Sequence, residues 1–398
     1  SQGNGLRKTL IVPRMAPQAV AVAAAMNGYG VDITVLPEPD ERSLLYANQI
    51  TSGAECLPFR VTLGDFMRFF NDSGHGLKEV EGFTGGAYGP CRFGKYAIEQ
   101  ERMLREIGFE LPIRTTVSNN AYRDLGLGIG FERLAWKGIV AVDCLDRFLW
   151  RSRPYEKEAG AADRLFDESL GRLCEHIRRR EPFGDLMRQT TADFQALIDP
   201  TLPRRPVVGI NGEIFLRSNR FSNNDLCRVC EAAGLEVFVS PFGEWLHYTS
   251  HRNLEDALRD RKPKKALTGF IRKQMQDRDE RAVTGCCQEL LDGGEPTVAE
   301  LITRTSRYLS PRCGGEAVLS IGGGLGWLQE PEVAGVISVM PHGCMPGGIV
   351  AAMSEDLGGA HGKPWISLTY DGFAESNNLA RINSFAEVIR FCRQSQET

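Results

Sequence analysis

The 398-residue sequence contains no apolar run long enough to span a bilayer, and we expect no signal peptide. Its 47 basic and 51 acidic side chains give a net charge of −4, which argues against a nucleic-acid partner. The eleven cysteines are an odd number, so a secreted disulfide framework is not expected. We therefore expect a cytoplasmic protein, with no membrane partner, in which some thiols bind a metal. The first residue is Ser1 rather than methionine, which indicates an expression remnant or a piece of a longer polypeptide.

Complete phosphate-binding loops are also missing. Residues Gly89–Tyr96 nearly match the G-x-x-x-x-G-K-[ST] pattern, but Tyr96 stands where a Mg²⁺-binding hydroxyl residue is needed. The glycine run Gly322–Gly326 lacks G-x-G-x-x-G spacing, and we interpret it as a tight turn after a strand. The sequence thus predicts that this chain does not bind ATP tightly.

Three cysteines share a local setting, each beside a proline and at or just before a predicted helix start: Cys56, Cys91 and Cys344. Proline is favoured at the first helical position. A thiolate there would meet unpaired backbone N–H groups and the positive end of a helix dipole, which should lower its pKa. Three such cysteines predict a 4Fe-4S cluster held by three thiolates. The alternative is that they are buried free cysteines at helix starts.

The other cysteines have less specific patterns. Cys227 and Cys230 have metal-knuckle spacing, but they lie on an apolar helix face without a second pair, which favours core packing. Cys144 and Cys313 adjoin predicted strands and are kept as spare ligands. The cysteines expected to have no ligand role are Cys174, Cys286, Cys287 and Cys392.

Short apolar runs alternate with amphipathic stretches, which is typical of an α/β fold with mainly parallel sheets. Three prolines in residues 199–206 predict a linker between two doubly wound, flavodoxin-like domains, 6–200 and 206–398, that face a cleft. The predicted strands are Thr9–Val12, Val31–Leu36, Ile139–Val142, Val207–Ile210, Leu235–Ser240, Ala317–Ile321, Val336–Met340 and Trp365–Thr369.

The order of these elements predicts where a cofactor would lie. Cys344 directly follows a predicted strand, and ligands gather at the carboxyl ends of strands in such folds. Because Cys56 and Cys91 precede the linker and Cys344 follows it, we expect the cluster between the two domains. Four acidic residues should reach the cleft, either as acid–base groups or as caps of helices and loops. They are Glu213 and Glu316, which we predict to be catalytic, and Glu244 and Asp371.

Seven short motifs occur in an order that resembles the 2-hydroxyacyl-CoA dehydratase/benzoyl-CoA reductase superfamily. The resemblance extends from about Lys8 to Phe391. It is closest to the C-terminal cluster-binding region of large acyl-CoA dehydratase activase-related proteins. The motifs are Thr51–Pro58, Gly89–Tyr96, Arg153–Glu156, Gly212–Arg217, Gly243–Tyr248, Cys344–Gly347 and Tyr370–Gly372.

This resemblance implies a fold, a cofactor and a partner. Three cysteines per subunit hold a 4Fe-4S cluster with one open iron in that superfamily, and the motifs place them at Cys56, Cys91 and Cys344. A separate actin-like ATPase supplies low-potential electrons there. Its nucleotide motifs are absent from this chain, so we expect an activase-type ATPase as partner, in a separate chain or in the N-terminal part of a longer polypeptide. The substrate would be a small molecule or an acyl-CoA, and a dimer is possible.

Three alternatives remain open at this point. One is a double-cubane 8Fe-9S cluster that uses Cys144 and Cys313 and reduces small unsaturated molecules. The second is a non-catalytic electron carrier or assembly scaffold, and the third is a structural zinc protein. No CoA-binding signature stands out, so the sequence does not name the substrate.

Overall fold

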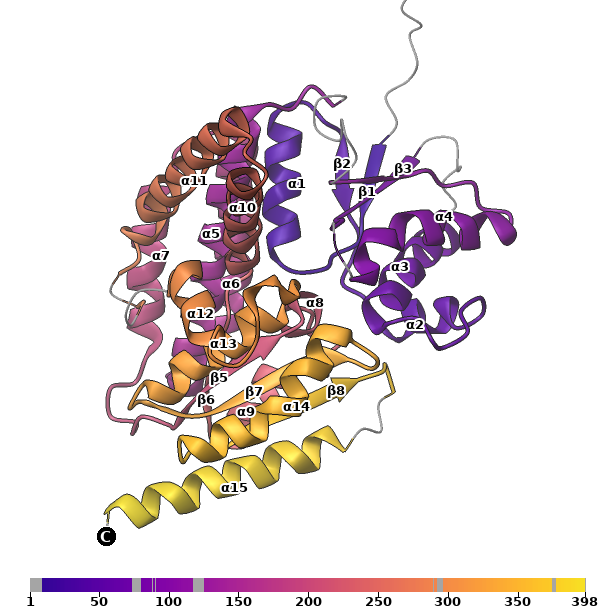
Figure 1. Ribbon diagram of the computed structural model, residues 1–398. Helices are drawn as coiled ribbons and strands as arrows, with labels where there is room; N and C mark the ends of the chain where they lie inside the picture. Colours follow the sequence, from indigo (N-terminus) through magenta and orange to yellow (C-terminus); the bar gives the residue numbers. More distant parts are fainter. Residues whose placement is uncertain are drawn as a thin grey trace, which may run out of the picture.

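The computed structural model describes residues 9–73, 80–87, 89, 91–116, 125–288, 290–291, 296–373 and 377–397. It contains two four-stranded sheets whose strands are all parallel, with strand orders β2-β1-β3-β4 and β6-β5-β7-β8 (Figure 1). Helices cover both sheets, which confirms the α/β, doubly wound class. One sheet precedes the proline-rich residues 199–206 and the other follows them.

The first sheet is built around its central strand. β1 (Thr9–Val12) pairs with β2 (Ile33–Val35) on one side and β3 (Val80–Thr84) on the other, and β4 (Ile113–Thr115) forms an edge. Successive side chains of a strand point to opposite faces. Leu10 and Val12 accordingly join the core on one face of the sheet, and Ile11 joins the core on the other.

Different helices fill these two cores. The face with Leu10 packs against α1 (Gln18–Gly28), α5 (Ile129–Ser152) and α6 (Ala161–Arg179). The opposite face packs against α3 (Leu57–Ser73) and α4 (Tyr96–Glu106). Both faces are therefore buried, as expected for a parallel sheet.

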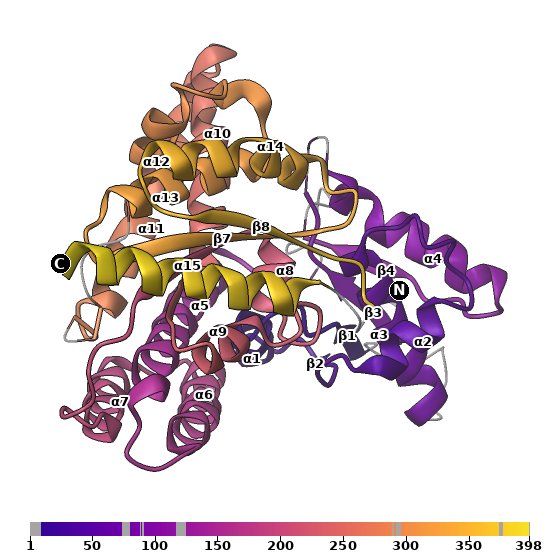
Figure 2. The same ribbon diagram turned by 90° about the horizontal axis from the view of Figure 1, so that it is seen from below.

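The second sheet has the same plan. Its central strands are β5 (Val207–Gly212) and β7 (Val333–Pro341), with β6 (Glu236–Val239) and β8 (Trp365–Tyr370) at the edges. In Figure 2, α14 and α15 lie on opposite faces of this sheet. The helices around it are α9 (Leu226–Ala232), α13 (Ala317–Gln329), α14 (Met345–Ala360) and α15 (Asn378–Glu397).

A helical layer joins the two sheets. The long helix α5 contacts α1 of the first half, and also β6, α10 and α11 of the second half (Figure 1). The remaining elements are α2 (Glu41–Ala47), η1 (Arg92–Lys95), η2 (Arg153–Tyr155), α7 (Gly184–Leu197), α8 (Ile214–Ser218), α10 (Gly243–Arg259), α11 (Pro263–Thr284), α12 (Val298–Thr305) and η3 (Pro311–Cys313). Because the halves share this layer, the division into domains at residues 200–206 stays a prediction.

Two predicted strands are wrong, because both segments are helical. Ile139–Val142 lies inside α5, and Ala317–Ile321 forms the start of α13. Both helices are buried around most of their circumference. Such a helix presents a short apolar run that resembles a buried strand, because periodicity alone does not separate the two. The strands β3 and β4 were missed.

The glycine run is helical as well, so its interpretation as a turn is wrong. A Cβ at Gly322 would lie 2.3 Å from the carbonyl oxygen of Leu301, and one at Gly324 would lie 2.3 Å from the Trp365 ring. These glycines let α13 approach α12 and β8 closely. No helix among the described residues is both long and apolar enough to cross a membrane.

Candidate metal centre

The carboxyl ends of the strands carry most of the predicted site residues. Cys91 lies in the segment after β3, Glu213 directly follows β5, and Cys344 lies three residues after β7. Cys56 comes from elsewhere in the first half, immediately before α3. These segments meet where α2 and α3 touch the second half. Leu44 and Leu57 join the core of the second sheet there.

Each of the three cysteines precedes a helical turn. Cys344 is the N-cap residue of α14, with extended backbone angles, and Cys91 is the N-cap of η1, which leads into α4. Cys56 precedes Leu57, the first residue of α3. Backbone N–H groups near the three sulfur atoms lower the thiol pKa values: those of Phe59 at Cys56, Phe93 at Cys91 and Gly347 at Cys344. Pro90, beside Cys91, lies outside the described residues.

The three thiols share one electrostatic neighbourhood. Charge on Cys56 raises the pKa of Cys91, and charge on Cys91 raises that of Cys344. The Glu213 carboxylate acts in the same direction on all three. The structure therefore brings together cysteines that are up to 288 positions apart, from Cys56 to Cys344, around Glu213.

The expected lowering of the thiol pKa values is wrong. Burial raises the pKa of Cys56 and Cys91, and it raises that of Cys344 to about 12. The backbone N–H groups at the helix starts lower each thiol pKa, as expected. Desolvation of the thiolate raises each pKa by more than these groups lower it. Without a bound cation these thiols are protonated, and a metal would have to displace their protons.

Two partly buried glutamates adjoin the cysteines. Burial raises the pKa of Glu213, and it raises that of Glu316 well above the ordinary range, with the Glu213 charge adding to the effect. Glu213 caps α8, because its Oε2 accepts the Leu216 N–H at 2.9 Å. Oε1 of Glu316 is buried without a hydrogen-bond partner among the described residues. The capping role, which was the alternative, is thus present at Glu213, and its acid–base role stays a prediction.

A buried arginine stands behind these acids. Arg217 Nη1 lies 4.0 Å from Glu316 Oε1 and 3.4 Å from Glu244 Oε1. Arg217 also lines a cavity of about 100 Å³ between the two halves, large enough for several water molecules. Asp371, in contrast, is exposed, and its carboxylate accepts the Phe373 N–H within its loop. Glu244 and Glu316 therefore both lie beside Arg217, whereas Asp371 satisfies a loop amide.

Other cysteines lie away from this group or at its margin. Cys144 is buried in the middle of α5, where its thiol faces Cys287, so its expected place beside a strand is wrong. Cys313 is exposed in η3. Gly315, two residues on, approaches Pro346 beside Cys344. Cys227 and Cys230 pack with the core of the second sheet, as predicted from their helix face. Cys392 is partly buried.

Sequence reasoning missed two residues of the site. The Tyr96 hydroxyl hydrogen-bonds to the Cys56 sulfur, and the Tyr96 ring is buried between Phe59 and Phe93. From the sequence, Tyr96 was interpreted only as a departure from the phosphate-binding loop pattern. Arg217 closes the Gly212–Arg217 motif, but no sequence signal showed that it is buried beside Glu316.

The distances between ligand atoms indicate whether a group of side chains could bind a single metal ion. Ligand atoms for a single ion lie close together, and among the described residues one such group has all its atoms within 4.8 Å: His247, Asp277 and Glu280. The three thiols do not meet this spacing. Among the described residues, the three cysteines therefore do not form a ready-made site for a single ion.

Two comparisons with known proteins identify no relative of this chain. A scan against protein-family models gives no match for the chain, and a search of curated proteins finds none that is significantly similar.

Proposed function

We propose that the chain is an iron–sulfur protein in which Cys56, Cys91 and Cys344 hold a 4Fe-4S cluster with one open iron. The observation that carries this proposal is that three cysteines from both halves share one electrostatic neighbourhood, with a backbone N–H near each sulfur that lowers its pKa. The resemblance to the 2-hydroxyacyl-CoA dehydratase/benzoyl-CoA reductase superfamily selects the same three residues. The proposed chemistry is reduction or radical formation on a small molecule or acyl-CoA.

The donor set fits this cofactor. Such a cluster supplies one-electron chemistry and an exchangeable iron position. Hydrogen bonds from the helix starts and from the Tyr96 hydroxyl stabilise negative charge on the thiolates. Burial of the same sulfurs opposes further negative charge, which keeps the reduction potential low.

The neighbouring acids would hold protons for the reaction. The raised pKa values of Glu213 and Glu316 mean that burial favours their neutral, protonated forms. A neutral carboxyl can lie beside an anionic cofactor without repulsion and can donate a proton to a reduced substrate. Arg217 then stabilises the carboxylate that remains on Glu316.

The electron source we propose is a separate ATP-dependent activase, because this chain lacks a complete phosphate loop. The eleven free cysteines fit a reducing cytoplasm. The double-cubane alternative keeps support from the segment of Cys313, which approaches that of Cys344 through Gly315 and Pro346. Cys144 gives no support to the double-cubane alternative, because its thiol is buried in the core around α5.

The proposed function is tested by whether the EPR signal of the reduced cluster changes when a ligand is added. Protein purified without oxygen is reduced with titanium(III) citrate and examined by EPR, first alone and then with cyanide or a candidate acyl-CoA. A signal that changes with added ligand is expected of a cluster with an open iron. An identical signal in every case would contradict catalysis and leave an electron carrier or scaffold, and a colourless protein that contains zinc would contradict both.

A further inference from the structure

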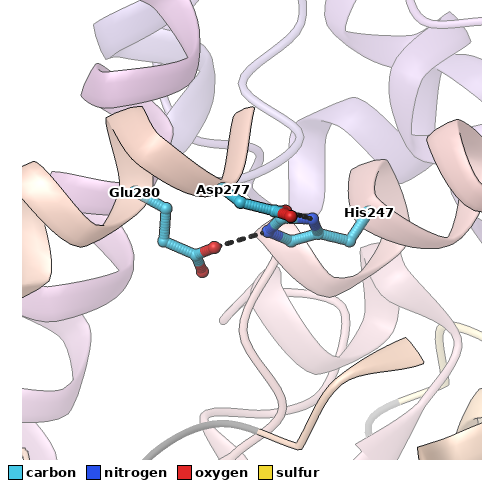
Figure 3. A group of neighbouring side chains, drawn as sticks. All are labelled: His247, Asp277 and Glu280. Carbon is cyan, nitrogen blue, oxygen red and sulfur yellow. Dashed lines mark hydrogen bonds and ion pairs between the residues drawn. The ribbon is translucent and has the colours of Figure 1, made fainter. Parts of the chain in front are cut away.

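A second group of ligand-type side chains lies between α10 and α11, away from the cysteines. His247 Nε2 is 2.7 Å from Glu280 Oε2, and His247 Nδ1 is 3.7 Å from Asp277 Oδ1. Figure 3 shows both carboxylates reaching the imidazole from α11, one toward each ring nitrogen. One ligand atom from each residue lies within 4.8 Å of the other two.

The positions of these residues follow from helix geometry. Asp277 and Glu280 are three residues apart, so they share one face of α11. The intervening Asp279 points elsewhere, toward Arg133 of α5. The His247 ring is packed edge-on against the Trp136 ring, with centroids 4.9 Å apart. Since the Trp136 indole also donates to the carbonyl of Gln276, the imidazole is held against α11.

We propose that His247, Asp277 and Glu280 form a site for one divalent transition-metal ion, of which Zn²⁺ is the representative. One imidazole nitrogen and two carboxylate oxygens are a donor set that such ions accept. Two donor atoms at tetrahedral positions of a zinc ion lie about 3.4 Å apart, because Zn–N and Zn–O bonds are about 2.0–2.2 Å. The most widely separated pair of ligand atoms therefore needs to close by up to about 1.4 Å, which side-chain rotation can supply.

Exposure leaves room for the remaining ligands. The side chains of His247, Asp277 and Glu280 are 16%, 26% and 29% exposed. Water can thus fill the positions that the protein leaves open, as at zinc sites with three protein ligands. The ion would tie α10 to α11 at the point where both helices pack against α5.

One side chain competes with the ion. Lys273 Nζ donates to both oxygens of Asp277, at 3.1 and 2.9 Å. Binding of a metal must displace this ammonium group from Asp277. If these residues formed only a structural ion-pair network, Lys273 would contribute to its stability. Removal of Lys273 would then weaken the network instead of favouring the metal.

Cobalt(II) gives a readout that separates this site from thiols. The anaerobically purified protein is titrated with Co²⁺ and followed by difference absorption. We expect one equivalent with weak d–d bands and without an intense thiolate charge-transfer band. His247→Gln and Glu280→Gln should each lower the affinity about tenfold or more. His251→Gln, one turn further along α10, is the matched control and should bind normally. A thiolate band at one equivalent, or unchanged binding in His247→Gln, would overturn the proposal.

The lysine provides a test that does not depend on removing a ligand. Lys273→Gln should bind Co²⁺ and Zn²⁺ more tightly than the unaltered chain, because the competing ammonium group is gone. Its melting temperature should also rise more when Zn²⁺ is added. Equal or weaker binding in Lys273→Gln would remove Asp277 as a ligand and with it the three-ligand site.

Discussion

Tyr96 is the residue whose role differs most between sequence and structure. Its hydroxyl hydrogen-bonds to the Cys56 sulfur, and burial raises its pKa well above the usual range, so it remains a donor at neutral pH. A donor to a ligating sulfur stabilises the reduced cluster. Tyr96→Phe should therefore shift the midpoint potential to more negative values in a redox titration monitored by EPR, with the iron content unchanged. Tyr29→Phe is the control, because Tyr29 packs against Phe131 in the core on the other face of the first sheet. An unchanged potential in Tyr96→Phe would argue against Cys56 as a ligand.

The same residues show what the sequence can predict about a site. The cysteine–proline pattern placed Cys56 and Cys344 at helix starts, where the structure has them, because capping chemistry is local. The predicted direction of the thiol pKa shift was wrong. The shift is dominated by burial, and burial depends on packing between segments that are distant in the sequence. The Cys56–Tyr96 contact depends on tertiary packing in the same way, and no short motif reveals it.

At the scale of elements, α13 provides the sharpest prediction. Gly322 and Gly323 are adjacent in this buried helix, but only Gly322 faces the Leu301 carbonyl, whereas a Cβ at Gly323 would meet nothing within 4 Å. Gly322→Ala should destabilise the protein by about 1–3 kcal/mol through overpacking. Gly323→Ala should stabilise it by about 0.5–1 kcal/mol through higher helix propensity. Denaturant unfolding of the two variants measures the difference. Equal effects would contradict the close packing of α13 on α12.

Elements were predicted unevenly for a physical reason. The predicted strands that the structure confirms are β1, β2, β5, β6, β7 and β8, because each lies in a short apolar run bounded by turn or polar residues. The helices α5 and α13 are buried on most sides and lack an amphipathic pattern over Ile139–Val142 and Ala317–Ile321. β4 has only three residues, too few for a periodic signal.

At the scale of the whole molecule, the two halves touch at several places. Helix α5 joins them through a broad helical layer, and Arg60 Nη1 donates to the Asp371 carbonyl at 3.0 Å beside the cysteines. A cofactor with ligands from both halves would stabilise this arrangement. Removal of iron by a chelator should lower the melting temperature and speed hydrogen exchange near Cys56 and residues 370–373. Amides in the middle of α5 serve as the internal control. Unchanged exchange near Cys56 after complete removal would indicate that the cluster does not link the halves.

The most direct test of the account is the iron and acid-labile sulfide content of the chain purified without oxygen. We expect about four of each per chain for one cubane. Replacement of Cys56, Cys91 or Cys344 by alanine should abolish the brown colour and most of the iron. Cys227→Ala, in the core of the second sheet, should retain both. Full iron in the three variants would contradict the proposed ligands, and near eight irons in the unaltered chain would contradict the single cubane.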